Sequence, residues 1–144
     1  MPIRFTWGSR TMFANTQMMG MDLGFPDVCL TPAPPSPVPV PIPYPNIAMQ
    51  MTAIPSQFKV LMGGTPAHNL GTVVPMSNGD NAGLALGVAS GLVMGPKRNL
   101  TGAFTCLVGA MPVTRMTSMS LQNSTNAPGC TLVPSQFKVL VLSP

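Results

Sequence analysis

The chain has 144 residues, of which 45% are apolar and 7% are charged, and its formal net charge is +4. This balance disfavours intrinsic disorder, the competing interpretation of so much proline and glycine, because disordered chains have few apolar residues and much charge. The seven scattered basic residues form no stripe that could follow nucleic-acid phosphates. Eighteen prolines and fourteen glycines leave no room for long helices. We therefore expect a small, mainly β domain of short strands and Gly/Pro-rich turns, with at most one short helix.

The N-terminal stretch MPIRFTWGSRTMF contains no continuous apolar run of the kind that a secretory signal peptide requires. We expect the protein to be made in the cytoplasm and, if it is exported, to leave without such a signal.

A proline-rich segment follows at residues 35–45, PSPVPVPIPYP, with proline at every odd position. One interpretation is an exposed polyproline II helix that binds aromatic-lined grooves. We favour an edge strand, because successive N–H groups of a strand point to opposite sides and alternate prolines remove donors from one edge only. Val38, Val40, Ile42 and Tyr44 would then donate along the other edge, and the proline edge would resist further pairing.

The heptapeptide PSQFKVL occurs at residues 55–61 and again at residues 134–140. Seven identities in succession indicate an internal repeat. A weaker copy, TCLVGAMPVTRMTS, begins at Thr105 and aligns with the sequence that begins at Lys59. The repeats predict three related strands, at residues 59–62, 105–108 and 138–141, of which the first two are followed by a glycine-containing turn.

The longest apolar stretch, residues 82–95, reads AGLALGVASGLVMG. It is well short of the roughly twenty residues that a membrane-spanning helix needs, so we expect no stable membrane insertion. A buried strand pair or a short, tightly packed helix is the favoured interpretation.

The strong transition-metal ligands of the sequence are three cysteines, Cys29, Cys106 and Cys130, and one histidine, His68. No CxxC pair is present, so spacing alone is a weak zinc signal, and buried thiols with a hydrogen-bonded histidine are the alternative. Cys106 aligns with Val60 and Val139 of the repeats, where a free cysteine packs as a small apolar side chain. With no Glu and three Asp, catalysis by paired carboxylates is disfavoured, and we expect no enzyme.

Several long motifs carry a resemblance to a known family: MFANTQMMGMDLGFPDVCLTPAPP, GGTPAHNLGT, MSNGDNAGLALGVASGLVMGP and TRMTSMSLQNSTNAPGCTLVPSQFKVL. They resemble the PAAR-like proteins that cap the spikes of type VI secretion systems and related contractile injection machines. The family takes its name from a Pro-Ala-Ala-Arg tetrapeptide, from which residues 66–69 and 112–115 both depart. The resemblance begins at residue 12, so we expect an N-terminal extension at residues 1–11 and a PAAR-like spike-tip domain at residues 12–144.

The resemblance implies a small cone that sits, one copy per trimer, on a trimeric valine-glycine-repeat spike protein, sharpens it and can recruit effector or adaptor proteins. Three similar strand-and-turn units would then give one chain three similar faces. It also implies residence in the bacterial cytoplasm before firing, and injection afterwards.

The resemblance also implies zinc near the vertex of the cone, bound through His and Cys side chains. Cys29, His68 and Cys130 are the expected ligands, and the fourth ligand is open.

Two other functions are weighed against the spike tip. A small secreted effector or toxin would need a further domain, for which we expect no room after the third repeat. A Pro-rich adaptor would bind its partners through residues 32–45.

Overall fold

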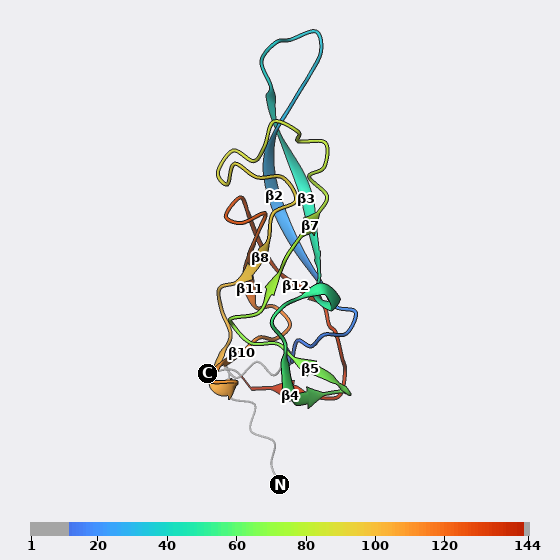
Figure 1. The fold of residues 1–144 in the computed structure, drawn as a ribbon, viewed down its shortest axis with the longest axis vertical. Helices are drawn as coiled ribbons and strands as arrows, with labels where there is room; N and C mark the ends of the chain where they lie inside the picture. The colour runs from blue at the N-terminus through green and yellow to red at the C-terminus, as the bar shows by residue number, and fades with distance from the viewer. Residues whose placement is uncertain (1–11, 143–144) are drawn as a thin grey trace, which may run out of the picture.

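The computed structural model describes residues 12–142, which form a tapering, mainly β molecule with a narrow and a wide end (Figure 1). In the first half the strands are β1 (Met12–Phe13), β2 (Met21–Thr31), β3 (Val40–Met49), β4 (Gln57–Met62), β5 (Thr65–Ala67), β6 (Val73–Val74) and β7 (Ser77–Asn78). In the second half they are β8 (Lys97–Asn99), β9 (Ala103–Val108), β10 (Met111–Val113), β11 (Met119–Gln122), β12 (Ala127–Val133) and β13 (Leu140–Val141). One 3-10 helix, η1, spans Gln50–Thr52. The mainly β prediction with at most one short helix is confirmed.

A seven-stranded antiparallel sheet, in the order β6-β8-β11-β12-β2-β3-β7, makes the body of the cone. Its longest members, β2 and β3, form a hairpin that reaches the narrow end, where residues 32–39 make the connecting loop (Figure 1).

The proline-rich segment forms an edge strand over residues 40–45. Val40, Ile42 and Tyr44 lie opposite β2 residues, while the other side of β3 pairs only with β7, at Ile47 and Ala48. The prolines between them therefore face an edge with no neighbouring strand, as the alternation predicts. The prediction is wrong for residues 35–39, which belong to the loop at the narrow end. There the backbone N–H of Val38 donates a hydrogen bond to the Ser36 hydroxyl and not to a neighbouring strand.

Residues 82–95 are neither the buried strand pair nor the helix that their apolar character suggested. They form successive turns that hydrogen-bond to the backbone of β2, with the amide of Leu30 donating to Leu86 and that of Val88 donating to Val28. Leu86, Gly91 and Met94 have positive φ angles, which are incompatible with a helix. No helix among the described residues is long and apolar enough to cross a bilayer.

Three similar antiparallel strand pairs form the wide end: the hairpins β4-β5 and β9-β10, and the pair β13-β1. We call all three pairs hairpins. Their registers match position by position, because Leu61 faces Pro66, Leu107 faces Pro112 and Leu140 faces Phe13. The three related strands predicted from the repeats therefore occupy equivalent places, although the third, predicted at residues 138–141, is a strand only at Leu140–Val141. The partner of the third strand comes from the other end of the chain, which the repeats alone did not indicate.

A closed ring of backbone hydrogen bonds joins these hairpins. The amide of Asn15 donates to the carbonyl of Thr114 at 2.9 Å, that of Thr114 to His68 at 3.3 Å, and that of His68 to Asn15 at 3.0 Å. Equivalent bridges flank the ring at Ala14↔Arg115, Thr16↔Ala67 and Asn69↔Val113. Each hairpin thus bonds to the next in the same way, and the wide end has pseudo-three-fold symmetry.

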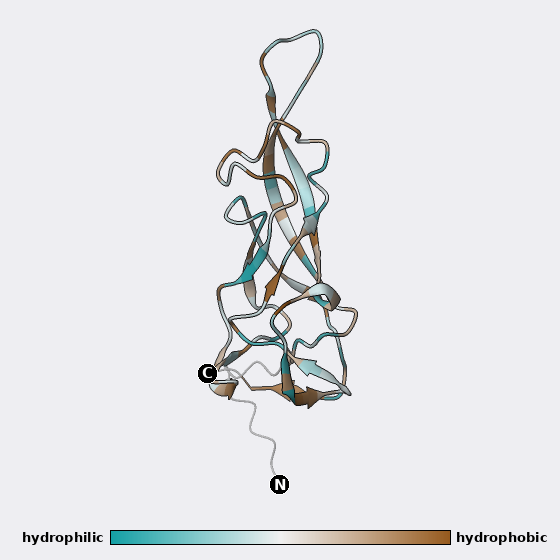
Figure 2. Ribbon diagram, in the orientation of Figure 1, coloured by the Kyte–Doolittle hydropathy of each residue, from teal (hydrophilic) through white to brown (hydrophobic). Residues whose placement is uncertain are grey.

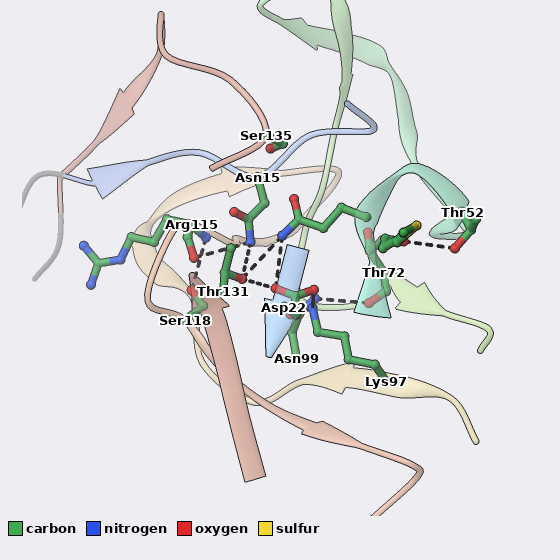
Figure 3. A network of polar contacts seen from close by, with 12 residues as sticks. Asn15, Asp22, Thr52, Thr72, Lys97, Asn99, Arg115, Ser118, Thr131 and Ser135 are labelled. Carbon is green, nitrogen blue, oxygen red and sulfur yellow. Dashed lines mark hydrogen bonds and ion pairs between the residues drawn. The ribbon is translucent and has the colours of Figure 1, made fainter. Parts of the chain in front are cut away.

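The buried side chains include an apolar cluster at the wide end and are mostly polar above this ring. An apolar cluster that includes Ala14, Ala67 and Val113 lies at the wide end, but the largest fully buried side chains of the molecule are mostly polar. Lys97 is 2% exposed and its ammonium lies 2.7 Å from the carboxylate of Asp22, which is fully buried (Figure 3).

Asp22 and Lys97 each have further partners. Asp22 accepts from the Gln50 amide at 3.1 Å and from the Thr131 hydroxyl, which also accepts from the Asn15 amide, while Lys97 donates to Asn99 at 2.6 Å (Figure 3). The network therefore links three strands of the body to the ring below it.

We expect Lys97→Met to lower the free energy of unfolding by about 3–5 kcal/mol, because it leaves the Asp22 carboxylate buried without its cation. Urea denaturation measures the change. Arg98→Met, on the same strand but exposed, is the matched control and should stay within about 0.5 kcal/mol of the wild type. The double variant with Asp22→Asn should recover part of the loss, and a Lys97→Met protein as stable as the control would contradict the role of the pair.

Candidate docking platform and candidate metal centre

Large apolar side chains on the strands of the wide end are exposed to solvent. In β4 the register jumps between Gln57 and Leu61, and in β9 it jumps between Ala103 and Leu107, so the residues between them have no partner across the hairpin. The phenylalanines of these bulges, Phe58 and Phe104, and the equivalent Phe137 are 77%, 61% and 72% exposed.

Leucines at equivalent positions add to this surface. Leu61, Leu107 and Leu140 are all more than half exposed, and the strands of the wide end are coloured largely as hydrophobic in Figure 2. We call the three phenylalanines and three leucines the docking platform. Exposed apolar surfaces of this kind mark interaction sites. The six side chains follow the pseudo-three-fold symmetry of the wide end.

A second apolar surface lies on the flank. Three adjoining grooves with volumes of 330, 140 and 210 Å³ share Met21 in their lining, and Met49 lies in two of them. Methionine side chains are flexible and polarizable, so such a surface can adapt to partners of different shape.

A buried group of metal-ligating side chains lies higher in the cone. Asp27 and Cys29 project from β2, and Asp80 comes from the turn after β7. The Cys29 thiol lies 3.4 Å from a carboxylate oxygen of Asp27 and 3.7 Å from one of Asp80. Gly83 lets the following loop pack here, because a Cβ at this position would lie 2.2 Å from that of Cys29.

Asparagine amides surround the two carboxylates. Asn123 donates to Asp80 at 2.7 Å and to Asp27 at 3.3 Å, while Asn46 donates to Asp27 at 2.6 Å and Asn126 also donates to it. The carbonyl oxygens of Asn123 and Asn126 accept backbone N–H groups of the 82–95 segment, which fixes the direction of both amides. The carboxylates are thereby satisfied by protein donors.

Burial raises the pKa of the Cys29 thiol to about 12, with Asp27 adding to the effect through its hydrogen bond and its charge. Burial likewise raises the pKa of Asp80 above its ordinary value. Cys29 is therefore a neutral thiol that donates to the carboxylates. Asp27, Cys29 and Asp80 could hold a metal ion, because carboxylate oxygen and thiolate sulfur are both zinc ligands, but a metal would have to displace the amide contacts.

The structure does not bring the predicted ligands Cys29, His68 and Cys130 together. Among residues 12–142, Asp27, Cys29 and Asp80 are the one group of three metal-ligating side chains whose atoms lie within 4.8 Å of one another. His68 lies in the ring at the wide end, with its Nε2 2.8 Å from the side-chain Oε1 of Gln17, and Cys130 is half-buried on β12. The predicted set is corrected accordingly, since only Cys29 belongs to a candidate centre.

The sequence contained a signal for the group that the prediction missed. Asp27 and Cys29 stand two residues apart in PDVC, so a strand directs both side chains to the same face. Asp80 lies in the turn SNGDN, and its approach to Cys29 depends on the pairing of β3 with β7, which no local pattern indicates.

Cys106 lies where the repeat alignment puts it. It packs against the apolar cluster of the wide end together with Val60 and Val139, the residues with which it aligns.

These features define a class of protein, the small β cone with a pseudo-three-fold apolar base. A family model described as the Toxin PAAR-like domain matches residues 20–129, which is more than half of the chain. The chain therefore belongs to the PAAR-like family, as the sequence motifs indicated. A search of curated proteins and a search of solved structures each found no match to the chain. The proposed extension at residues 1–11 lies outside the described residues and stays a prediction.

The stability of the protein should depend on pH through His68. Burial, with the nearby Lys97 charge, lowers the pKa of His68 from 6.5 to about 4. Between these values the unfolded chain binds the proton and the folded chain does not, so this contribution is complete above about pH 6.5 and is lost as the pH falls towards 4. It amounts to about 3 kcal/mol.

Urea denaturation at pH 7 and pH 4.5 measures this dependence. His68→Gln, which has no titrating group at this position, should lose less stability than the wild type over the same interval. Equal losses in the two proteins would assign the pH dependence to other groups.

Proposed function

We propose that the chain is a structural spike-tip protein that caps and sharpens the trimeric valine-glycine-repeat spike of a type VI secretion or related contractile injection machine, one copy per trimer. The docking platform is the contact surface in this proposal. Membership of the PAAR-like family supports the proposal, because such domains are associated with this class of spike.

One observation carries the proposal: the residues repeated in all three hairpins are the exposed ones. Phenylalanine occupies the first bulge position three times, and leucine occupies the position three residues later three times. The positions that face the interior vary instead, as in the half-buried set Val60, Cys106 and Val139. Folding selects interior residues, so repetition confined to the outside favours a three-fold partner.

The proposal includes a cellular route and excludes catalysis. The protein would reside in the bacterial cytoplasm before firing and would leave with the spike, without a signal peptide. Its task would be mechanical, and no residue is assigned a catalytic role.

Delivery of a toxin is the second candidate, and the family description favours it. In this version the cone links a toxic effector to the spike. The methionine-lined flank would accept such cargo, because its apolar grooves are separate from the docking platform.

We expect Phe58→Asp, Phe104→Asp and Phe137→Asp each to weaken binding to the spike trimer of the same organism at least tenfold, because each places a charge in an apolar contact. Native mass spectrometry of the wild-type complex should give one chain per trimer. Leu84→Asp, in the 82–95 segment and 70% exposed, lies outside the docking platform; it is the matched control and should bind normally. Three chains per trimer, or normal binding by the phenylalanine variants, would refute the proposal.

Zinc, the cofactor implied by the resemblance, would have Asp27, Cys29 and Asp80 as its ligands in this chain. Elemental analysis of the purified protein should then give zinc near one equivalent, and a chelator should lower the melting temperature. Cys29→Ser and Asp80→Asn should abolish both results, whereas Cys130→Ser and His68→Gln should retain them. Wild-type protein that contains no zinc and whose melting temperature does not change with the chelator would refute zinc as a cofactor.

A further inference from the structure

The docking platform has a hollow between its three strands. The hollow has a volume of 330 Å³ and is lined by Met62 of β4, by Thr105 and Cys106 of β9, and by residues 139–142. All three hairpins thus contribute to its wall, and the apolar cluster of the wide end forms its floor through Met62, Cys106 and Val139.

A flat partner surface would close this hollow without filling it. At about 30 Å³ per molecule it would trap on the order of ten waters. A trapped water needs two to four polar partners, and this wall is mostly apolar, with Thr105 among its lining residues, so most of the enclosed waters would lose hydrogen bonds. Filling the space with apolar groups instead adds to the free energy of docking.

We propose that the partner fills the hollow with an apolar plug, a protrusion at its three-fold axis that seats among Met62, Cys106 and Val139. The inference rests on the proposed function, since it describes the partner that the docking platform receives. A trimer places identical groups around its axis, and a hollow walled by three equivalent strands is the matching shape. Cys106 is then a specificity-determining residue, because its small side chain, at a position where the other two hairpins carry valine, keeps the space open.

Two variants of the full-length chain test the plug. Cys106→Phe fills the hollow, and Cys106→Ser keeps its size. With a plug in place, Cys106→Phe should weaken binding to the spike trimer at least tenfold, while Cys106→Ser should stay within threefold of the wild type. If the hollow is closed by a flat surface, added apolar bulk would leave binding unchanged or tighten it, which would overturn the proposal.

Thiol labelling gives an independent measurement should Cys106→Phe fail to fold, as circular dichroism would reveal. In a Cys130→Ser background, Cys106 is the reactive thiol, because Cys29 is fully buried. N-ethylmaleimide should modify Cys106 in the free chain, the spike trimer should protect it, and prior modification should block docking. Docking by the modified chain, or full reactivity of Cys106 in the complex, would overturn the plug.

Protection of Cys106 already in the free chain would also overturn the proposal, because a segment of the chain itself or a second copy would then occupy the hollow. These results are separate from a failure of the proposed function. If the phenylalanine substitutions abolish docking while Cys106→Phe and modification of Cys106 leave it unchanged, the spike-tip role is supported and the plug is refuted. A wild-type chain that does not bind the spike refutes both.

Discussion

The ring of backbone hydrogen bonds through Asn15, His68 and Thr114 is the constraint on which the wide end depends. Each of the three residues donates to one neighbour and accepts from the other, so the ring closes without an unpaired amide. Backbone bonds make no demand on side-chain identity, which is why an asparagine, a histidine and a threonine can occupy equivalent places. The symmetry of the wide end is therefore a property of the main chain, and the side chains are free to serve other purposes.

A cone of this width cannot bury large apolar side chains along its whole length. The apolar cluster at the wide end consists mostly of alanine and valine, and above it Lys97 and Gln50 occupy the interior and both contact the Asp22 carboxylate. Polar side chains of this length can join strands across a narrow interior through specific hydrogen bonds. The loss of one partner in such a network is costly, because it leaves a buried polar group without a hydrogen bond. The network therefore favours a single arrangement of the strands.

The sequence predicted those parts of the molecule that depend on local patterns. Alternating prolines predicted an edge strand, and the repeats predicted three equivalent strands, because both patterns act within one segment. The sequence did not indicate the candidate metal centre, because the proximity of segments such as those that carry Cys29, His68 and Cys130 depends on the whole topology. Residues 82–95 show a related failure, because their apolar side chains suggested burial while positive φ values at Leu86 and Met94 impose turns.

The third hairpin connects the docking platform to the folding of the entire cone. β1 and β13 pair across almost the full length of the described chain, so pairing them before the segments between them fold would close a loop of nearly that whole length. Contacts this distant in sequence carry a large loop-closure cost before they contribute stability. Two hairpins can form locally, whereas three equivalent faces exist only in the completed fold. A three-fold partner that needs all three faces would therefore bind the folded cone and not partly folded chains. The pseudo-symmetry would then let the partner discriminate folded from partly folded protein.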